Sequence, residues 1–294
     1  MRIIFIGAVE FSLRALQHLS LIGANVVGVC TNRNSTLNTD HADLSIHCSQ
    51  MAIPCLNTED INTPATLKWI TDCKPNVIFC FGWSRLLKKP ILELAPLGVI
   101  GFHPAALPMN RGRHPLIWAL VLGLSETAST FFFMDEGADS GHIISQHNIV
   151  IEPEDDARSL YDKVVITALK QISKFVPQLA ECTFPQIHQD EKRSNTWRKR
   201  GKADGIIDWR MSASSVHNLV RGLTHPYVGA EFQFDGQVCK VWKSHLVGQP
   251  AENIEPGKVI GHDGKGKPFV KCGEGAICLL ETEPAFDLAR GTYL

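Results

Sequence analysis

The stretch NVIFCFGWSRLLKKPILELAPLGVIGFH, residues 76–103, holds two short apolar runs separated by a segment of helix length. The two runs, 77–81 and 99–103, are rich in β-branched and aromatic residues, as buried strands are. Two buried strands joined by a helical crossover are typical of a parallel sheet. We therefore predict an open α/β fold around this stretch.

The same alternation extends in both directions along the chain. Apolar runs at 2–8 and 25–31 predict two further strands, with helix-length segments at 12–23 and 63–73. Beyond residue 128, two apolar runs lie close together around a Gly-rich turn and predict an antiparallel pair added to the sheet. Residues 155–182 keep an apolar spacing of three and four, which predicts a long helix capped by Asp155 or Asp156.

The composition changes at residues 188–205, where Lys, Arg and turn-forming residues crowd a polar run. We interpret this run as part of a linker. After it, a short helix and closely spaced short strands predict a small barrel or sandwich. The predicted fold is thus a Rossmann-like, mostly parallel α/β sheet with flanking helices, plus a small C-terminal β-barrel-like domain. The predicted bounds are 1–185 for the catalytic domain, 186–203 for the linker and 204–294 for the C-terminal domain.

Composition and charge limit the classes of function. Of the 294 residues 44% are hydrophobic, and the formal net charge is −1, from 29 Lys and Arg against 30 Asp and Glu. This balance gives no general attraction to nucleic acid or to an anionic membrane. The N-terminus has no leader pattern, so we expect a cytoplasmic protein. The nine cysteines show no CxxC spacing, and we expect them to be reduced core residues.

Polar residues follow the predicted strands. Ligands of open α/β sheets bind at the carboxyl ends of the strands, where His103 lies. Asp139, in a Gly-flanked turn after another strand, is placed to orient the His103 imidazole. A lone histidine at a strand end is more often structural, and one His with one Asp is a weak signal. No GxSxG elbow, GxGxxG loop or metal-ligand spacing is present, so the residues alone indicate an α/β enzyme with no metal.

Three segments, NVIFCFGWSRLL, GFHPAALPMNRGRHPLIWALVLG and MDEGADSGHIISQ, carry a resemblance that continues after the linker through residues 204–244. Through these segments, nearly the whole chain resembles the formyltransferases that use formyltetrahydrofolate as donor. The family signature is an Asn-x-His on a strand-end loop with an Asp about three dozen residues later. Here His103 and Asp139 fit it, 36 residues apart. The resemblance implies that a protonated His103 stabilises the oxyanion on the formyl oxygen while Asp139 orients the imidazole and helps remove the amine proton.

The first signature position is Gly101, where the family has asparagine. That asparagine would donate a second hydrogen bond to the oxyanion, and losing one such donor typically costs roughly 10²–10³ in rate. Three explanations are open: a slow or inactive enzyme, a replacement donor, or a water beside Gly101. Asn110, in the same loop, is the first candidate for a replacement donor, although it is equally a turn residue.

The resemblance also implies two binding regions. The donor would bind at backbone and apolar groups of Phe81, Gly82, Trp83, Arg85, Leu86 and Leu87, with Asp135, Glu136, Gly137 and Ala138 closing on the pterin. Core packing is an equal alternative for Phe81, Leu86 and Leu87. The acceptor would meet Glu10, Phe11 and Ser12, and Arg111 or Arg113 would pair with its phosphate or carboxylate. The alternative is that one of these two arginines forms a structural ion pair within the protein.

The sequence favours a nucleotide-linked amino sugar, as used in polysaccharide biosynthesis, as the acceptor. The loop NRGRHPLIWAL resembles the sugar formyltransferases, and the stretch 31–44 carries one arginine against two aspartates, which argues against tRNA. The basic run around 192–202 is the counter-evidence. The alternatives are a methionyl-tRNA formyltransferase, a formyltetrahydrofolate hydrolase and an inactive binding protein. No nucleic-acid or membrane partner is expected, and a homodimer is one assembly that the sequence allows.

Overall fold

The computed structural model describes residues 1–33, 39–248, 253–285 and 287–294. It consists of two compact units, each of which we describe by itself. The first unit comprises residues 1–115, 127–149 and 162–197, and the second comprises 116–126, 150–161 and 198–294. Residues 186–197 of the predicted linker thus belong to the first unit. None of the described helices is long and apolar enough to cross a membrane.

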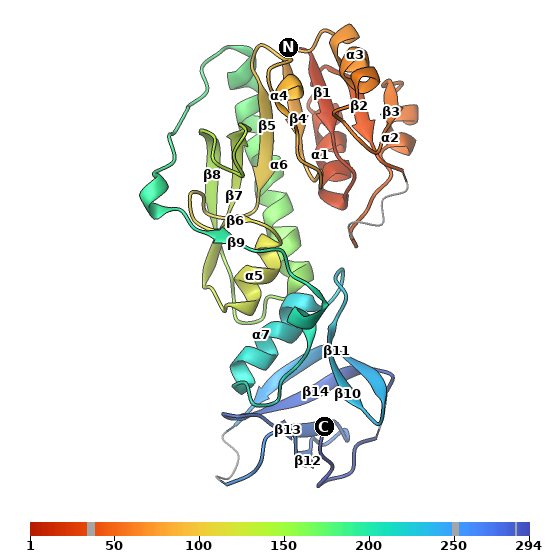
Figure 1. Cartoon of the computed structure of the whole chain (residues 1–294), viewed down its shortest axis with the longest axis vertical. Helices are drawn as coiled ribbons and strands as arrows, with labels where there is room; N and C mark the ends of the chain where they lie inside the picture. The colour runs from red at the N-terminus through yellow and green to blue at the C-terminus, as the bar shows by residue number, and fades with distance from the viewer. Residues whose placement is uncertain (34–38, 249–252, 286) are drawn as a thin grey trace. The chain divides into compact units, whose positions relative to one another are not determined.

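A seven-stranded sheet forms the centre of the first unit, in the order β3-β2-β1-β4-β5-β7-β8 (Figure 1). The five strands from β3 to β5 are parallel, and β7 pairs antiparallel with β5 so that His103 lies opposite Thr130. This confirms the predicted, mostly parallel sheet. The strands are β1 Ile3–Ile6, β2 Val26–Thr31, β3 Cys55–Asn57, β4 Val77–Cys80, β5 Val99–His103, β7 Glu126–Phe133 and β8 Ile143–Val150.

Helices cover both faces of this sheet because its strands are apolar on both sides. On one face, α1 (Glu10–Leu21) and α6 (Ala157–Ala180) lie side by side, joined by Arg14 and Asp162 at 3.0 Å. On the other face, Ile70 of α3 (Pro64–Asp72) and Ile91 of α4 (Lys89–Leu92) pack with the isoleucines of β1 and β4. The remaining short helix of this part is α2 (Ser45–Gln50).

The helix ends follow the sequence closely. Thr63 caps α3, its hydroxyl accepting from the Thr66 N–H at 3.2 Å. At the start of α6, the Asp156 carboxylate accepts from the Ser159 N–H at 2.9 Å, and the Ser159 hydroxyl accepts from the Asp156 N–H at 3.0 Å. Of the two predicted caps, Asp156 is therefore the one that takes this role.

The second unit is a five-stranded antiparallel sheet with a helix packed on it, which confirms the predicted small C-terminal β domain. The strand order is β10-β11-β14-β13-β12. Helix α7 (Ala213–Leu223), capped by Ser212, buries Val216, Leu219 and Val220 in the core of this unit. The strands are β10 Ala230–Phe234, β11 Gln237–Val247, β12 Val259–His262, β13 Pro268–Lys271 and β14 Ala276–Glu283, and α5 (Pro115–Val121) precedes β7.

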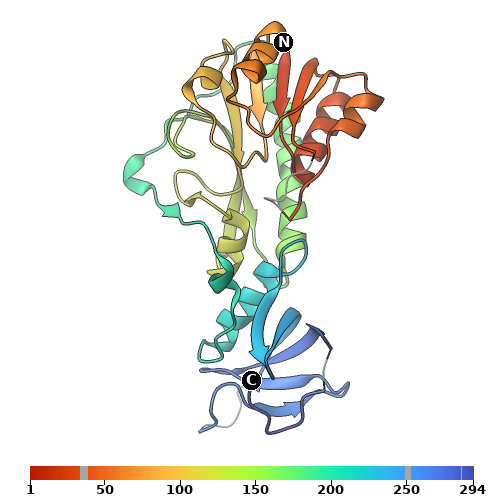
Figure 2. The same ribbon diagram turned by 45° about the vertical axis from the view of Figure 1, so that its right-hand side comes forward.

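The chain after α6 returns along β8 to the loop that follows β5 (Figures 1 and 2). Ile187 forms a bridge with Ile143 at the start of β8. Two residues of β9 (Thr196–Trp197) then pair in parallel with β6 (Arg111–Gly112). Two 3₁₀ turns, η1 (Glu191–Arg193) and η2 (Lys202–Gly205), complete the stretch. The residues expected to form a plain linker therefore include ordered elements.

Candidate active site

His103 is the last residue of β5, and its side chain is almost fully buried, with 5% of the residue exposed. One ring nitrogen, Nε2, lies 2.7 Å from the backbone carbonyl oxygen of Asn110. The other, Nδ1, lies 3.6 Å from the Asp139 carboxylate, an ion-pair distance. An imidazole can donate to only one of these two acceptors, whereas an imidazolium can donate to both. Both ring nitrogens of His103 therefore face a hydrogen-bond acceptor.

The loop from His103 to Asn110 is held by side chains of the antiparallel strands. The buried Thr130 hydroxyl donates to the Ala105 carbonyl at 2.7 Å. The Gln146 amide donates to the Leu107 carbonyl and to the Thr130 hydroxyl, both at 2.9 Å. Because these carbonyls belong to a loop with no sheet partner, the side chains supply the hydrogen bonds that burial requires.

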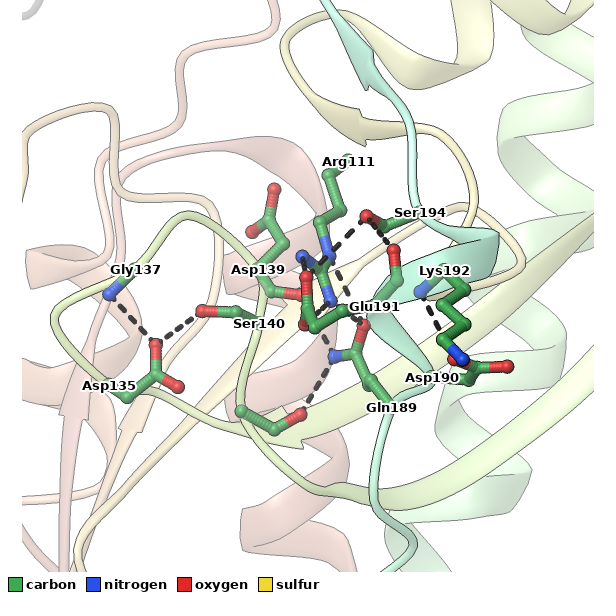
Figure 3. Close-up of polar contacts among 11 residues, drawn as sticks. Arg111, Asp135, Gly137, Asp139, Ser140, Gln189, Asp190, Glu191, Lys192 and Ser194 are labelled. Carbon is green, nitrogen blue, oxygen red and sulfur yellow. Dashed lines mark hydrogen bonds and ion pairs between the residues drawn. The ribbon is translucent and has the colours of Figure 1, made fainter.

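Asp139 comes from a different place, the exposed loop 135–140 between β7 and β8. Its backbone has a φ of +56°, a left-handed conformation that aspartate tolerates better than most residues. The carboxylate oxygen that faces His103 also accepts from the Gly112 N–H at 2.9 Å. Asp135 closes the loop by accepting from the Gly137 N–H at 2.9 Å and from the Ser140 hydroxyl at 2.7 Å (Figure 3). The structure thus brings the two signature residues, His103 and Asp139, together.

Arg111 is held inside this region and does not reach outward. Its guanidinium donates to the Gln189 amide oxygen at 2.8 and 3.2 Å and to the Glu191 carboxylate at 2.7 and 2.8 Å (Figure 3). The hydrogen bond with Glu191 raises the pKa of Arg111 and lowers that of Glu191. Of the two arginines assigned to the acceptor, Arg111 therefore has the structural ion-pair role that we kept as the alternative. Arg113 is exposed, with a 3.3 Å contact to the Ser84 carbonyl.

Residues of the predicted linker enclose the same loop. The Asn195 side chain accepts from the Asn110 N–H at 2.7 Å, and the Asn195 carbonyl accepts from the Arg111 N–H at 3.0 Å. Gly112 has a φ of +101°, and a Cβ there would lie 2.3 Å from the Trp197 carbonyl oxygen. Only glycine lets the loop after β5 approach the segment around Trp197 this closely.

Gly101 lies on β5 two residues before His103, and its missing side chain leaves no empty space. A Cβ at this position would lie 2.8 Å from Met134 Cγ, 3.0 Å from Phe132 Cζ and 3.2 Å from Met134 Sδ. The neighbours are apolar, so they offer no partner to an ordered water. This weighs against the water explanation. Asn110 does meet His103, as expected of a replacement donor, but through its backbone carbonyl, which accepts and cannot donate.

The residues assigned to the donor fall into two groups. Phe81 and Leu87 are buried in the core of the first unit, Phe81 with its ring 5.3 Å from that of Phe79. Arg85 and Leu86 are exposed, and Leu86 shows 69% of its surface. Gly82 and Trp83 are half-buried, and residues 135–138 are exposed. Phe81 and Leu87 therefore have the core role kept as the alternative, whereas Arg85, Leu86 and residues 135–138 are exposed to solvent.

The residues assigned to the acceptor at the end of β1 are also divided. The buried Ser12 hydroxyl donates to the Phe81 carbonyl at 2.5 Å and accepts from the Val9 N–H at 3.2 Å. The Phe11 ring packs 4.2 Å from that of Phe102. Both therefore join the first turn of α1 to the core, Ser12 at the residue after β4 and Phe11 at β5, and Glu10, which is half-buried, is the member of the three nearest the surface.

Sequence reasoning missed three residues that shape the site. Gln189 and Asn195 were read as linker, and Asn62 was not considered, although its amide donates to the Leu86 carbonyl at 3.0 Å and its carbonyl accepts from the Lys88 N–H at 2.8 Å. Each acts through backbone groups of a distant loop, for which a single sequence carries no signal. Within the described residues, no group of three His, Cys, Asp or Glu side chains is arranged to hold a metal ion.

Comparison with known proteins gives two family matches and close full-length relatives. Residues 1–176 match the model described as formyl transferase, and residues 199–286 match that of the formyl transferase C-terminal domain. A methionyl-tRNA formyltransferase of Caldanaerobacter subterraneus subsp. tengcongensis is 32% identical over 288 residues, covering 96% of this chain and 92% of the relative.

Solved structures show the same fold at low sequence identity. The N-formyltransferase from Helicobacter canadensis, in complex with folinic acid and dTDP-3-aminofucose, superposes with a TM-score of 0.68 at 17% identity, covering 94% of this chain and 98% of that one. The sugar 3N-formyl transferase WlaRD gives a TM-score of 0.69, also at 17% identity, with 97% and 99% covered. From the two family matches and the full-length relative, this chain belongs to the formyltransferase family.

Proposed function

We propose that this protein transfers a formyl group from formyltetrahydrofolate to the amine of a nucleotide-linked amino sugar. Family membership supports the formyl transfer, and the solved neighbours whose descriptions name folate compounds support the donor. The observation that carries the chemistry is the pair formed by the buried His103 and the half-buried Asp139 at the carboxyl end of β5. The cytoplasm, expected from the sequence, remains the proposed location.

The proposed mechanism uses direct attack. The amine lone pair forms a bond to the formyl carbon, and the electrons of the C=O bond move to oxygen to give a tetrahedral oxyanion. Protonated His103 donates a hydrogen bond to this oxygen through Nε2, which has to leave the Asn110 carbonyl 2.7 Å away, while Asp139 orients the ring at Nδ1 and accepts the proton that the amine loses. The intermediate collapses by breaking the bond to the folate nitrogen, which takes up a proton. No nucleophile of the protein is required.

A second donor to the oxyanion has to come from outside β5, because Met134 and Phe132 crowd Gly101. We propose the Asn110 side-chain amide for this role, since its backbone carbonyl already lies 2.7 Å from His103 Nε2. Replacing Asn110 with alanine should then lower kcat by roughly 10²-fold with little change in acceptor binding. An unchanged kcat in Asn110→Ala would show that Asn110 is not the second donor and that, of the two residues, His103 alone stabilises the oxyanion.

The acceptor is proposed from the charges near the expected binding surfaces. The stretch 31–44, which follows β2, carries one arginine and two aspartates, although residues 34–38 lie outside the described residues. In the basic run, Arg198 forms a bidentate pair with Asp204 and lowers the pKa of that carboxyl. Arg200 is buried beside the Trp118 ring, 4.7 Å from its centroid. These two arginines of the basic run thus already interact within the protein. This weakens the argument that the run binds a long polyanion.

Methionyl-tRNA is the second candidate acceptor, because the full-length relative at 32% identity bears that name. A hydrolase or an inactive binding protein are the further alternatives. The test is to incubate the full-length protein with formyltetrahydrofolate and either a panel of nucleotide-linked amino sugars or charged initiator tRNA, and to measure products by mass. We expect a gain of one formyl group on a sugar. Efficient formylation of the tRNA would contradict this proposal, and folate turnover without any acceptor would indicate a hydrolase.

A further inference from the structure

Gln189, which has no role in the proposed mechanism, makes four hydrogen bonds through its side chain. The residue is 2% exposed. Its amide oxygen accepts from Arg111 at 2.8 and 3.2 Å, and its amide nitrogen donates to the backbone carbonyls of Asp139 at 2.9 Å and Gly141 at 2.7 Å (Figure 3). One side chain therefore joins the loop that follows β5 to the loop that carries Asp139.

Both loops need such a connection. Asp139 has a left-handed backbone, and its neighbours 135–138 are exposed. Among the described residues, the Asp139 carboxylate meets the end of β5 and the loop after it through the 3.6 Å approach to His103 and the hydrogen bond from the Gly112 N–H. A shift of the Asp139 backbone would lengthen both contacts. Gln189 fixes that backbone at the residue itself and two residues beyond it.

The other end of the connection is also fixed. Arg111 is 7% exposed, and its guanidinium lies between Gln189 and Glu191. A buried guanidinium is stable only when its donors are satisfied. Next to it, Asn195 accepts from the Asn110 N–H, and the Asn110 carbonyl meets His103. The segment 189–197, which we call the brace, thus contacts the backbone beside each member of the proposed catalytic pair.

We propose that Gln189 is a positioning residue for formyl transfer, which sets the distance between Asp139 and His103 from outside the sheet. This inference rests on the proposed roles of His103 and Asp139. Gln189 does not touch the reacting atoms and acts through the backbone of Asp139. A misplacement of about 1 Å at a catalytic group can cost on the order of 10²-fold in rate.

The test compares two buried glutamines. Gln171, 1% exposed in α6, donates through its amide to the Ser129 carbonyl at 3.1 Å and to the Ser145 hydroxyl at 2.9 Å. Gln171→Leu and Gln189→Leu therefore each remove a buried amide nitrogen that donates two hydrogen bonds, although only the Gln189 oxygen also accepts any from the described residues. We expect Gln189→Leu to lower kcat by about 10²-fold and to change the pH–rate profile in the same direction as Asp139→Asn. Gln171→Leu should shift the unfolding temperature by a similar amount with kcat within about threefold of wild type.

Two further variants keep the inference testable if Gln189→Leu does not fold. Gln189→Glu keeps the acceptor for Arg111 but loses the donor to the two carbonyls, so it should lower kcat in the same way. Glu191→Ala removes the exposed outer partner of Arg111 and should lower kcat by several-fold in a folded protein. Equal kcat losses in the two leucine variants, or a wild-type kcat in folded Gln189→Glu and Glu191→Ala, would overturn the inference. If instead His103→Asn retains wild-type turnover, the proposed function fails and not only the positioning role.

Discussion

The two members of the proposed catalytic pair are anchored in different ways. His103 ends a central strand, and the loop after it is held by buried side chains of β7 and β8. Asp139 lies on an exposed loop and is held by its own turn and by a segment fifty residues further along the chain. The sheet fixes the histidine side, whereas the brace fixes the aspartate side. Changes to the sheet should therefore affect stability first, and changes to the brace should affect rate first.

The largest expected effect is at Asp139 itself. Asp139→Asn keeps an oxygen for the Gly112 N–H but removes the negative charge beside His103. We expect kcat to fall by about 10³-fold, because general acid–base groups typically contribute 10²–10⁴-fold. The unfolding temperature should stay close to that of wild type. A folded variant with near-normal kcat would remove the aspartate from the mechanism.

Removing a contact between the sheet and the loop after His103 should have a smaller effect, mainly on stability. Thr130→Val leaves the Ala105 carbonyl without its donor and removes one of the acceptors of the Gln146 amide. We expect a loss of about 2 kcal/mol in the free energy of unfolding. Ser129→Ala is the matched control, because the buried Ser129 hydroxyl has no hydrogen-bond partner among the described residues. Denaturant unfolding of both variants measures the difference, and equal losses would contradict the anchoring role of Thr130.

A substitution at Gly101 tests how β5 anchors the histidine side of the pair. Gly101→Asn would push a side chain against Met134 and Phe132. We expect a loss of about 1 kcal/mol in stability, at the low end for overpacking because methionine is flexible. Adding Met134→Ala to Gly101→Asn should recover part of it. If Gly101→Asn alone is as stable as wild type and faster, the strand has room for the family asparagine after all, and the crowding seen here does not explain its loss.

The smallest expected effect is a change in the unfolding temperature at acid pH when Glu191 of the brace is replaced. The hydrogen bond with Arg111 lowers the pKa of Glu191 below its ordinary value of 4.5. A carboxylate with a lowered pKa in the folded state adds stability above its unfolded pKa, and this is lost as the pH falls through the folded value. The difference in unfolding temperature between wild type and Glu191→Gln should therefore be small at pH 7, begin to shrink as the pH falls below 4.5, and vanish once the pH is below the lowered pKa of the folded state. Because Glu191 is exposed, the difference stays modest at any pH.

The fold was largely predictable from the sequence, because apolar periodicity reports burial directly. The runs that became β1, β2, β4 and β5 and the Asp156 cap of α6 follow from local patterns. His103 and Asp139 were also found, since both follow strands and fit a family motif.

The assignments that changed share a physical cause. Phe11 and Ser12 follow a strand, as binding residues do, but they turn into the core and join neighbouring strands. A guanidinium in a loop has the same sequence signature whether it meets a ligand, as proposed for Arg113, or a distant Gln, as for Arg111. The brace was missed because a polar run with turn residues looks identical whether solvent or a distant backbone accepts its hydrogen bonds.

The most direct measurement of the central claim is the turnover of wild type and His103→Asn under single-turnover conditions, with formyltetrahydrofolate and the best amine acceptor. Asparagine still offers a neutral donor but cannot carry the charge of an imidazolium. We predict that wild type converts the amine into a product heavier by one formyl group and that His103→Asn is at least about 10²-fold slower at an unchanged unfolding temperature. Equal rates in the two folded proteins would contradict the proposal that this buried histidine performs the transfer.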